Sequence, residues 1–322
     1  MARAHYADER SVMPSSHFAD RLLDAIDQRQ SPSVVAMDPV FENLPAELRE
    51  SVCNTSIDGH VEAIRIFSTC VLNTIAPIVP CVKINSAYFE RYYDAGVALY
   101  HQLVQTASAL GLLVIGDVKR GDVGHTAEMY AKGQLAKPEL SSLSSSHTPD
   151  AVTINGYFGL DGVKPFIDTA CKDQRGLFVL VRTSNPSAAV IQDVQTVDGR
   201  KVHEVVAAEV ARWADDPRTI GTRGYSSIGA VVATRNRDDA ARLRSAMPKS
   251  IFLVPGYGAQ GGTAEDFRLY FKSDGTGAII AAGRSVIFAH ERPEYLGQPW
   301  DRAVEDACRA FAKDVGRLIS RV

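Results

Sequence analysis

The stretch LLVIGDVKRGD (residues 112–122) decides the fold. It begins as an apolar run of the kind that forms a buried β-strand, and it places Asp117, Lys119 and Asp122 directly behind that run. Two nearby carboxylates repel each other, and burying a charge is costly unless an opposite charge compensates it. The rest of the sequence therefore has to show why a strand leads straight into acidic and basic residues.

Similar short apolar runs recur along the chain and alternate with amphipathic stretches. Most of them are continuously apolar and rich in Val and Ile, as expected of parallel strands with both faces buried. The other runs are residues 33–37, 80–84, 151–154, 177–182, 228–233, 251–256 and 278–283. Eight strand–helix repeats predict an α/β fold, a single (β/α)₈ TIM barrel. A doubly wound open sheet is the alternative that the pattern leaves open.

The segments outside these repeats have their own patterns. Apolar residues at 18, 22, 23 and 26 predict an extra N-terminal helix, capped by Ser15 or Ser16. Residues 1–15 lack the apolar region of a secretory signal and are expected to be disordered or loosely attached, with 16–322 forming the barrel. The Ser-rich stretch 139–150 is predicted to be a surface loop, and 192–200 an insertion after the fifth strand.

Composition limits the class of protein. The 322 residues are 45% hydrophobic and 23% charged, which is ordinary for a globular protein. The net charge of −3 argues against a nucleic-acid partner. No apolar run approaches the ~20 residues of a transmembrane helix. The five cysteines are scattered without a CxxC pair, which argues against a disulfide framework or a zinc site and favours a cytoplasmic location.

Charged residues gather where the predicted strands end. In a barrel of this kind the active site lies at the carboxyl ends of the strands. Asp117 and Lys119 are two positions apart and so point to the same side of a strand, while Lys83 ends the neighbouring strand. We expect Lys83, Asp117, Lys119 and Asp122 to form an alternating cluster, in which opposite charges within ~4–6 Å offset the carboxylate repulsion. A purely structural ion-pair network at the rim is the alternative.

Two late segments indicate a phosphate. VPGYGAQGG (254–262) is a glycine-rich turn that can expose backbone N–H groups, and AAGRS (281–285) follows the next strand. Barrels frequently bind phosphate with the loops after strands seven and eight. Here those loops contain Gln260, Gly283 and Arg284, and an arginine can hold a phosphate with two hydrogen bonds. The sequence therefore predicts a phosphorylated substrate.

These segments resemble orotidine 5′-phosphate decarboxylase, in its longer bacterial type. DVKRGDVGHT is similar to the D-x-K-x-x-D signature of that family, a signature shared with sugar-phosphate lyases and synthases of the same suprafamily. VPGYGAQGG and AAGRS are similar to its phosphate-binding segments, and VKINSAYFERY and VRTSNPSA to its second-strand and fifth-strand segments. The resemblance runs in the right order from about Phe18 to the C-terminus.

The resemblance implies an activity and a role for each site residue. The activity would be decarboxylation of orotidine 5′-phosphate to UMP and CO₂ in de novo pyrimidine biosynthesis. Lys119 would donate a proton to C6, Asp117 would lie against the substrate carboxylate, and Lys83 would bridge the acids and touch the ribose. Asp38 would bind ribose hydroxyls, and Ser184 would contact the amide edge of the pyrimidine.

It also implies that Gln260, Gly283 and Arg284 hold the phosphate. Asp122, with Thr126 close behind it, would reach the site of the other subunit in a homodimer. The family uses no metal and no organic cofactor, and the sequence contains no His or Cys cluster with ligand spacing.

Two other functions stay open. A magnesium-dependent sugar-phosphate decarboxylase or aldolase would need an extra carboxylate near the second strand, where Lys83 stands and Asn85 follows. The other is a catalytically silent nucleotide-binding protein, which the presence of Asp117, Lys119 and Asp122 together disfavours. Tyr88 and Phe89 are expected to pack under the helix that follows the second strand.

Overall fold

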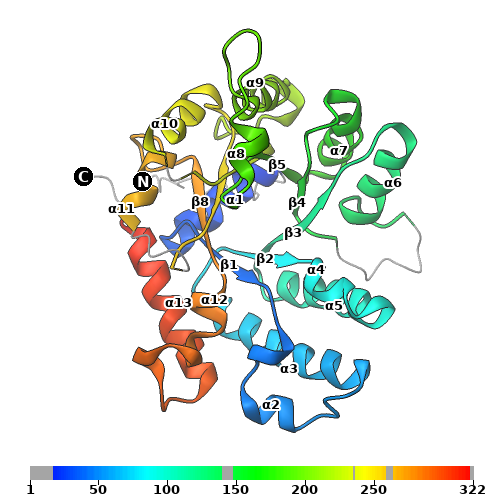
Figure 1. Ribbon diagram of the computed structural model, residues 1–322, viewed down its shortest axis with the longest axis vertical. Helices are drawn as coiled ribbons and strands as arrows, with labels where there is room; N and C mark the ends of the chain where they lie inside the picture. The colour runs from blue at the N-terminus through cyan, green and yellow to red at the C-terminus, as the bar shows by residue number, and fades with distance from the viewer. Residues whose placement is uncertain (1–16, 140–147, 235, 259–263, 320–322) are drawn as a thin grey trace, which may run out of the picture.

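A computed structural model describes residues 17–139, 148–234, 236–258 and 264–319. Its centre is a closed barrel of parallel strands in which each strand pairs with its neighbours in chain order and β8 pairs with β1 (Figure 1). The strands are β1 (Ser33–Met37), β2 (Cys81–Asn85), β3 (Leu113–Arg120), β4 (Ala151–Ile154), β5 (Gly176–Arg182), β6 (Ile228–Val232), β7 (Phe252–Pro255) and β8 (Ala278–Ala282). The predicted (β/α)₈ barrel is confirmed, and closure excludes the open sheet.

The helices surround the barrel as an outer layer (Figure 1). Strand residues that point outward, such as Val35 and Val232, pack with the helices in one large apolar core. The helices are α1 (Phe18–Arg29), α2 (Ala46–Glu50), α3 (Ile57–Ile75), α4 (Ala87–Glu90), α5 (Tyr93–Ala109), α6 (Gly124–Gln134), α7 (Leu160–Asp173), α8 (Ala188–Gln192), α9 (Val202–Ala214), α10 (Arg237–Ala246), α11 (Ala264–Phe267), α12 (Arg284–Ile287) and α13 (Trp300–Gly316). None of the described helices is long and apolar enough to cross a membrane.

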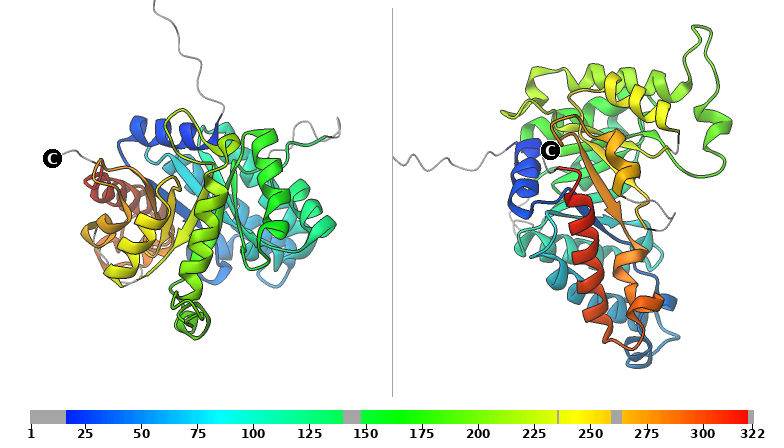
Figure 2. Two further views of the ribbon diagram at one scale, coloured as in Figure 1. Left: turned by 90° about the horizontal axis from the view of Figure 1, so that it is seen from above. Right: turned by 90° about the vertical axis from the view of Figure 1, so that its left-hand side faces the viewer.

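The predicted N-terminal helix is α1, which lies on the side of the molecule away from α8 (Figure 2). Its apolar face packs with inward-pointing strand residues in a second core. The ring of Phe18 meets Phe178 of β5 edge-on, with centroids 6.1 Å apart. A Cβ at Gly176 would lie 2.1 Å from Phe18 Cδ1, so only glycine fits there. Because these contacts lie at the amino ends of the strands, α1 closes that end and leaves the opposite end for a site.

The predicted serine cap of this helix is wrong. The N-cap residue of α1 is His17, which makes no side-chain capping bond, while Ser15 and Ser16 lie outside the described residues. The buried carboxylate of Asp20 instead accepts hydrogen bonds from the backbone N–H groups of Thr222 (2.8 Å) and Arg223 (3.0 Å). Contacts with a distant loop therefore fix the start of α1, and a local sequence signal could not show them.

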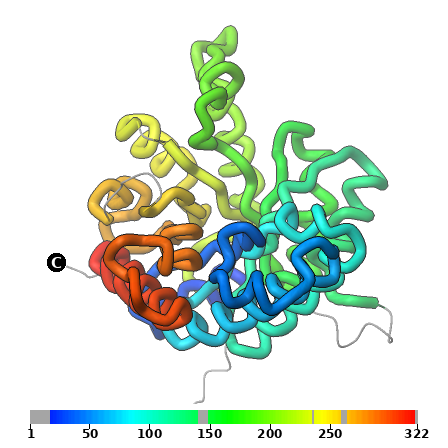
Figure 3. Tube along the Cα trace, turned by 60° about the horizontal axis from the view of Figure 1, so that its bottom comes forward, coloured from blue at the N-terminus to red at the C-terminus, as the bar shows by residue number. Residues whose placement is uncertain are grey.

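The predicted insertion after the fifth strand is confirmed as a segment that projects from the barrel. It contains α8 and a short antiparallel bridge between Gln195 and Lys201, and it stands out clearly from the rest of the chain (Figure 3). It returns to the outer layer at α9. Of the Ser-rich stretch, residues 140–147 lie outside the described residues.

Candidate active site

A cavity of about 330 Å³ lies among the carboxyl ends of the strands and is lined by four of the predicted residues, Lys83, Asp117, Lys119 and Ser184. Lys119 Nζ lies 2.6 Å from Asp117 Oδ1, and Lys83 Nζ lies 2.5 Å from Asp117 Oδ2. Each oxygen of this buried carboxylate therefore faces its own ammonium group. Three members of the predicted four-residue cluster, Lys83, Asp117 and Lys119, are therefore in contact.

The charge state of Asp117 follows from these contacts. Burial disfavours the carboxylate, but the ammonium groups of Lys83 and Lys119 outweigh it and lower the pKa of Asp117 from 3.8 to about 2. Burial also disfavours the Lys83 ammonium, yet Asp117 and Asp38 raise the pKa of Lys83 above its ordinary value. Both groups are therefore charged at neutral pH.

An irregular backbone at the end of β3 brings Asp117 and Lys119 together. The pairing with β4 shifts register between Gly116 and Arg120, and Lys119 has a left-handed φ of 47°. The buried hydroxyl of Thr153 in β4 fills the gap: it accepts from the Lys119 N–H (3.0 Å) and donates to Asp117 Oδ1 (2.8 Å). Sequence reasoning assigned Thr153 no role, although a lone polar residue in an apolar strand was the available signal.

Asp38, which follows β1, supplies the second carboxylate of the cluster. Its Oδ1 lies 3.7 Å from Lys83 Nζ. Burial raises the pKa of Asp38 above 3.8; Lys83 opposes this and the charge of Asp117 adds to it. A Cβ built on Gly283 would lie 3.6 Å from Asp38 Oδ2, so the end of β8 lies beside this acid.

Asp122 does not join the cluster within one chain, and the expectation of a four-member cluster is wrong in that respect. Its side chain accepts a hydrogen bond from the Val123 N–H at 2.8 Å, and Thr126 is exposed on α6. The Asp122 carbonyl lies against Gly162 of α7, where an added Cβ would approach it to 2.8 Å. Asp122 is accordingly not among the residues that line the cavity.

The predicted base-binding and phosphate-binding residues fall in different places. Ser184 lines the same cavity as Lys119. Arg284 lines a different cavity, of about 730 Å³, together with Gly258 and Ser285, and this cavity shares no lining residue with the one that holds Lys119. Gln260 lies outside the described residues.

Tyr88 packs against the large apolar core, in agreement with the expectation that it is a packing residue. Its ring is half-buried against the core. Burial raises the pKa of its phenol, and the charges of Asp38, Lys83 and Arg284 also act on it.

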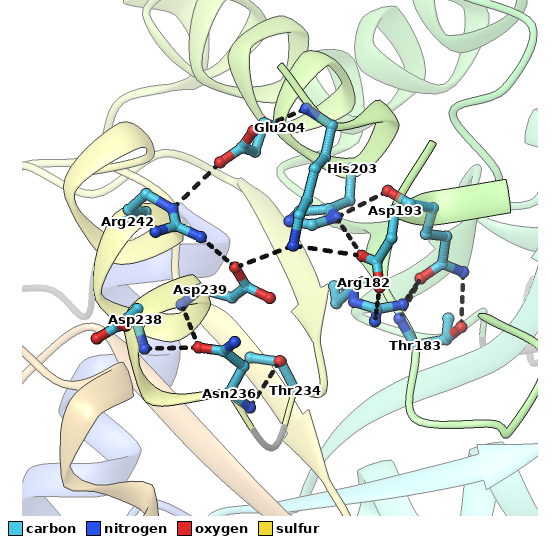
Figure 4. Close-up of polar contacts among 12 residues, drawn as sticks. Arg182, Thr183, Asp193, His203, Glu204, Thr234, Asn236, Asp238, Asp239 and Arg242 are labelled. Atoms are coloured by element: carbon cyan, nitrogen blue, oxygen red, sulfur yellow. Dashed lines mark hydrogen bonds and ion pairs between the residues drawn. The ribbon is translucent and has the colours of Figure 1, made fainter. Parts of the chain in front are cut away.

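The donor sets do not suit a metal ion. Both oxygens of Asp117 are already bonded to ammonium groups. Among the His, Cys, Asp and Glu side chains that the structure describes, one group has ligand atoms close enough together to hold a metal ion. It consists of Asp193, His203 and Asp239 (Figure 4). The ammonium group of Lys201 lies 3.9 Å from Asp193 Oδ1 and 3.6 Å from Asp239 Oδ1, which makes this group an ion-pair network.

Comparison with known proteins agrees with this geometry. Residues 68–296 match the model of the orotidine 5′-phosphate decarboxylase / HUMPS family. The chain is 38% identical to orotidine 5′-phosphate decarboxylase of Rhodopirellula baltica over 295 residues, which cover 91% of this chain and 95% of that protein. It is 33% identical to the enzyme of the same name from Caldicellulosiruptor saccharolyticus, covering 94% and 99% of the two chains.

A solved structure of a related protein has the same fold. The crystal structure of a Streptomyces avermitilis protein assigned to orotidine 5′-phosphate decarboxylase superposes with a TM-score of 0.74 at 29% identity, covering 98% of this chain and 99% of that chain. Sequence and architecture agree over nearly the full length, and this chain belongs to the orotidine 5′-phosphate decarboxylase / HUMPS family.

Proposed function

We propose that this protein is a carboxy-lyase that converts orotidine 5′-phosphate to UMP and CO₂ in pyrimidine biosynthesis. The observation that carries the proposal is the position of Lys119, whose ammonium group is held 2.6 Å from a buried carboxylate while about half of its side chain (49%) is exposed. Such a group supplies a positive field and a proton at one place in the cavity.

The chemistry requires both. When the bond between C6 and the carboxylate carbon breaks, CO₂ leaves and the electron pair remains on C6, where the ring delocalises it poorly. The Lys119 ammonium stabilises this charge and then transfers its proton to C6, which leaves a neutral amine that takes a proton from water. Asp117, whose Oδ1 lies 2.6 Å from the Lys119 ammonium, holds that group in place and would lie against the substrate carboxylate.

The remaining residues hold the substrate. Asp38 and Lys83, which lie beside each other at the ends of β1 and β2, would bind the ribose hydroxyls. Ser184 at the end of β5 would contact the amide edge of the pyrimidine. Together, Gly283, Arg284 and Gln260 would bind the phosphate, and its binding energy would help to lower the barrier at the distant C6.

We further propose a homodimer in which Asp122 and Thr126 contribute to the partner's site. In one chain Asp122 makes no contact with the cluster, and several exposed large apolar side chains lie in the segments around it. These are Val123 before α6, Met129 and Tyr130 on α6, Tyr157 and Phe158 in the loop after β4, and Leu160 at the start of α7. An exposed patch of this kind is typical of a protein interface. The free cysteines of the described chain are consistent with a cytoplasmic enzyme.

A magnesium-dependent lyase is not favoured, because Lys83 and Lys119 occupy both oxygens of the carboxylate that a cation would need. A silent nucleotide-binding protein would not need an ammonium group placed in this way.

The decisive experiment is an absorbance assay with orotidine 5′-phosphate, in the presence and in the absence of EDTA. We expect conversion to UMP that is unchanged by the chelator. Failure to consume this substrate, or loss of activity with EDTA, would contradict the proposal.

A further inference from the structure

We infer that Asn185 is a further substrate-binding residue, whose side-chain amide donates a hydrogen bond to a carbonyl oxygen of the pyrimidine ring. Arg182, Gln192 and Thr183 act as positioning residues that fix the direction of that amide. The inference rests on the proposed function and deepens it, because it identifies a contact that recognises the base.

The position of Asn185 favours the base over the sugar or the phosphate. Asn185 follows β5 and lines the cavity that holds Lys119. In the closed barrel β5 lies four strands from β1 in either direction. Asp38 and Gly283 lie at the β1 and β8 side, so a substrate whose ribose and phosphate bind there extends its ring toward β5. The cavity on this side has apolar walls from Leu180, Val231 and Leu253, which suit the faces of a ring.

Two groups that can only donate hydrogen bonds fix the orientation of the Gln192 side-chain amide. The Oε1 atom of Gln192 lies 2.8 Å from Arg182 Nη1 and 2.9 Å from the backbone N of Thr183. A guanidinium and a backbone N–H have no acceptor lone pair to offer. The amide of Gln192 must therefore present its oxygen to them and its nitrogen to the opposite side.

Each following bond is determined by the one before it. The Nε2 atom of Gln192 donates to Thr183 Oγ1 at 2.7 Å. The single proton of that hydroxyl is then free to be donated to Asn185 Oδ1, which lies 2.6 Å away. Asn185 thus presents its oxygen to Thr183, which leaves its NH₂ group on the other side of the amide, in a residue that lines the cavity. An NH₂ group only donates, and the ring carbonyls of the substrate only accept.

The projecting segment after β5 thereby gains a role at the site. Gln192 ends α8, and its backbone carbonyl accepts a hydrogen bond from His203 Nδ1 at 2.9 Å. The next residue, Asp193, forms an ion pair with Arg182 at 3.2 Å (Figure 4). These contacts from α8 and α9 hold the Gln192 side chain over the end of β5.

The test compares two ligands, UMP and ribose 5-phosphate, which lacks the base, by calorimetry. Asn185→Ala should weaken UMP binding about tenfold, the usual effect of losing one hydrogen bond, and leave ribose 5-phosphate binding unchanged. Asn185→Asp keeps the acceptor for Thr183 but removes the donors, so it should weaken UMP binding at least as much. Normal UMP binding by Asn185→Asp would overturn the inference, as would an equal loss for both ligands.

The positioning role is tested by Gln192→Ala against a matched control, Gln195→Ala, on the same segment. Gln192→Ala should selectively weaken UMP binding, and should have a smaller effect in a chain that already carries Asn185→Ala. Gln195→Ala should change neither ligand. If the losses of UMP binding caused by Gln192→Ala and by Asn185→Ala were fully additive, coupling through Asn185 would be refuted. Thermal unfolding of each variant shows whether it is folded.

This inference and the proposed function fail in different ways. If the unaltered protein neither binds UMP nor consumes orotidine 5′-phosphate, the proposed function fails. If it does both and Asn185→Ala behaves like the unaltered protein, only the inference fails.

Discussion

The ammonium nitrogen of Lys119 lies 2.6 Å from Oδ1 of Asp117, yet the two side chains differ sharply in exposure, 49% for the lysine and 7% for the aspartate. The carboxylate is fixed inside the barrel end, and the cation that it holds faces the cavity. This asymmetry suits a proton donor, because the charged group is restrained without being covered.

Replacing Lys119 removes the proposed proton donor. Lys119→Ala should lower kcat by at least roughly 10²–10⁴-fold, the contribution usual for a general acid, while UMP still binds. The measurement pairs the absorbance assay with calorimetry. Lys313→Ala, at an exposed lysine on α13, is the control and should keep full activity. Near-normal turnover by Lys119→Ala would exclude the assigned role.

Thr153→Val tests whether the β3 irregularity depends on one hydroxyl. The change leaves the Lys119 N–H without its acceptor and removes a donor to Asp117, so unfolding free energy should fall by about 1–3 kcal/mol. We also expect kcat to fall, because Lys119 loses its fixed position. Urea denaturation and kinetics measure both effects. The control, Thr106→Val, removes a hydroxyl that is bonded only within helix α5. If Thr153→Val has no larger effect than this control, the irregular backbone at the end of β3 does not depend on the Thr153 hydroxyl.

Asp38→Asn should stabilise the fold and weaken activity. The folded-state pKa of Asp38 is raised above 3.8, so the folded protein binds this proton more tightly than the unfolded chain does. The resulting contribution to stability is fully present below pH 3.8 and is lost as the pH rises through the folded-state pKa. Asparagine does not titrate. The stability gain of Asp38→Asn over the unaltered protein should therefore be present at pH 7 and diminish as the pH falls toward 3.8. Urea titrations at several pH values measure it, and a gain that grows on acidification would reverse the assigned sign. KM should rise because a ribose contact is altered.

Arg284→Ala tests the phosphate assignment. Phosphate binding that is partly realised in the transition state predicts both a higher KM and a lower kcat. Steady-state kinetics should show both, whereas Arg309→Ala, at an exposed ion pair with Glu305 on α13, should show neither. Unchanged kinetics in Arg284→Ala would remove this residue from the site.

The shared site of the proposed homodimer can be tested by mixing two inactive variants. Lys119→Ala and Asp122→Ala should each be nearly inactive alone. If Asp122 serves the partner's site, random dimers of the two contain one intact site in each mixed pair, and about a quarter of full activity should return. A mixture as inactive as its components would show that each chain uses its own Asp122.

The sequence by itself determined the eight strands, their parallel α/β arrangement and the placement of Asp117 and Lys119 at the end of the third strand, whereas barrel closure and the contact between these two side chains came from the tertiary structure. The strands and this placement follow from local information: continuous Val- and Ile-rich runs indicate strands buried on both faces, and two residues two apart on a strand point to one side. The boundaries were correct to within one residue for most strands. β3 was an exception, because Arg120 pairs with Ile154 only after a register shift that no local pattern reveals.

Only the tertiary structure decided which distant groups complete the cluster. It placed Asp38 beside Lys83 and set Thr153 between Asp117 and the Lys119 backbone. It also left Asp122 outside the cluster and oriented Asn185 through a chain of hydrogen bonds. The physical reason is that a hydrogen bond or an ion pair depends on a separation of about 3 Å between atoms far apart in sequence. Strand register and barrel closure fix such separations, and hydrophobic periodicity does not encode them.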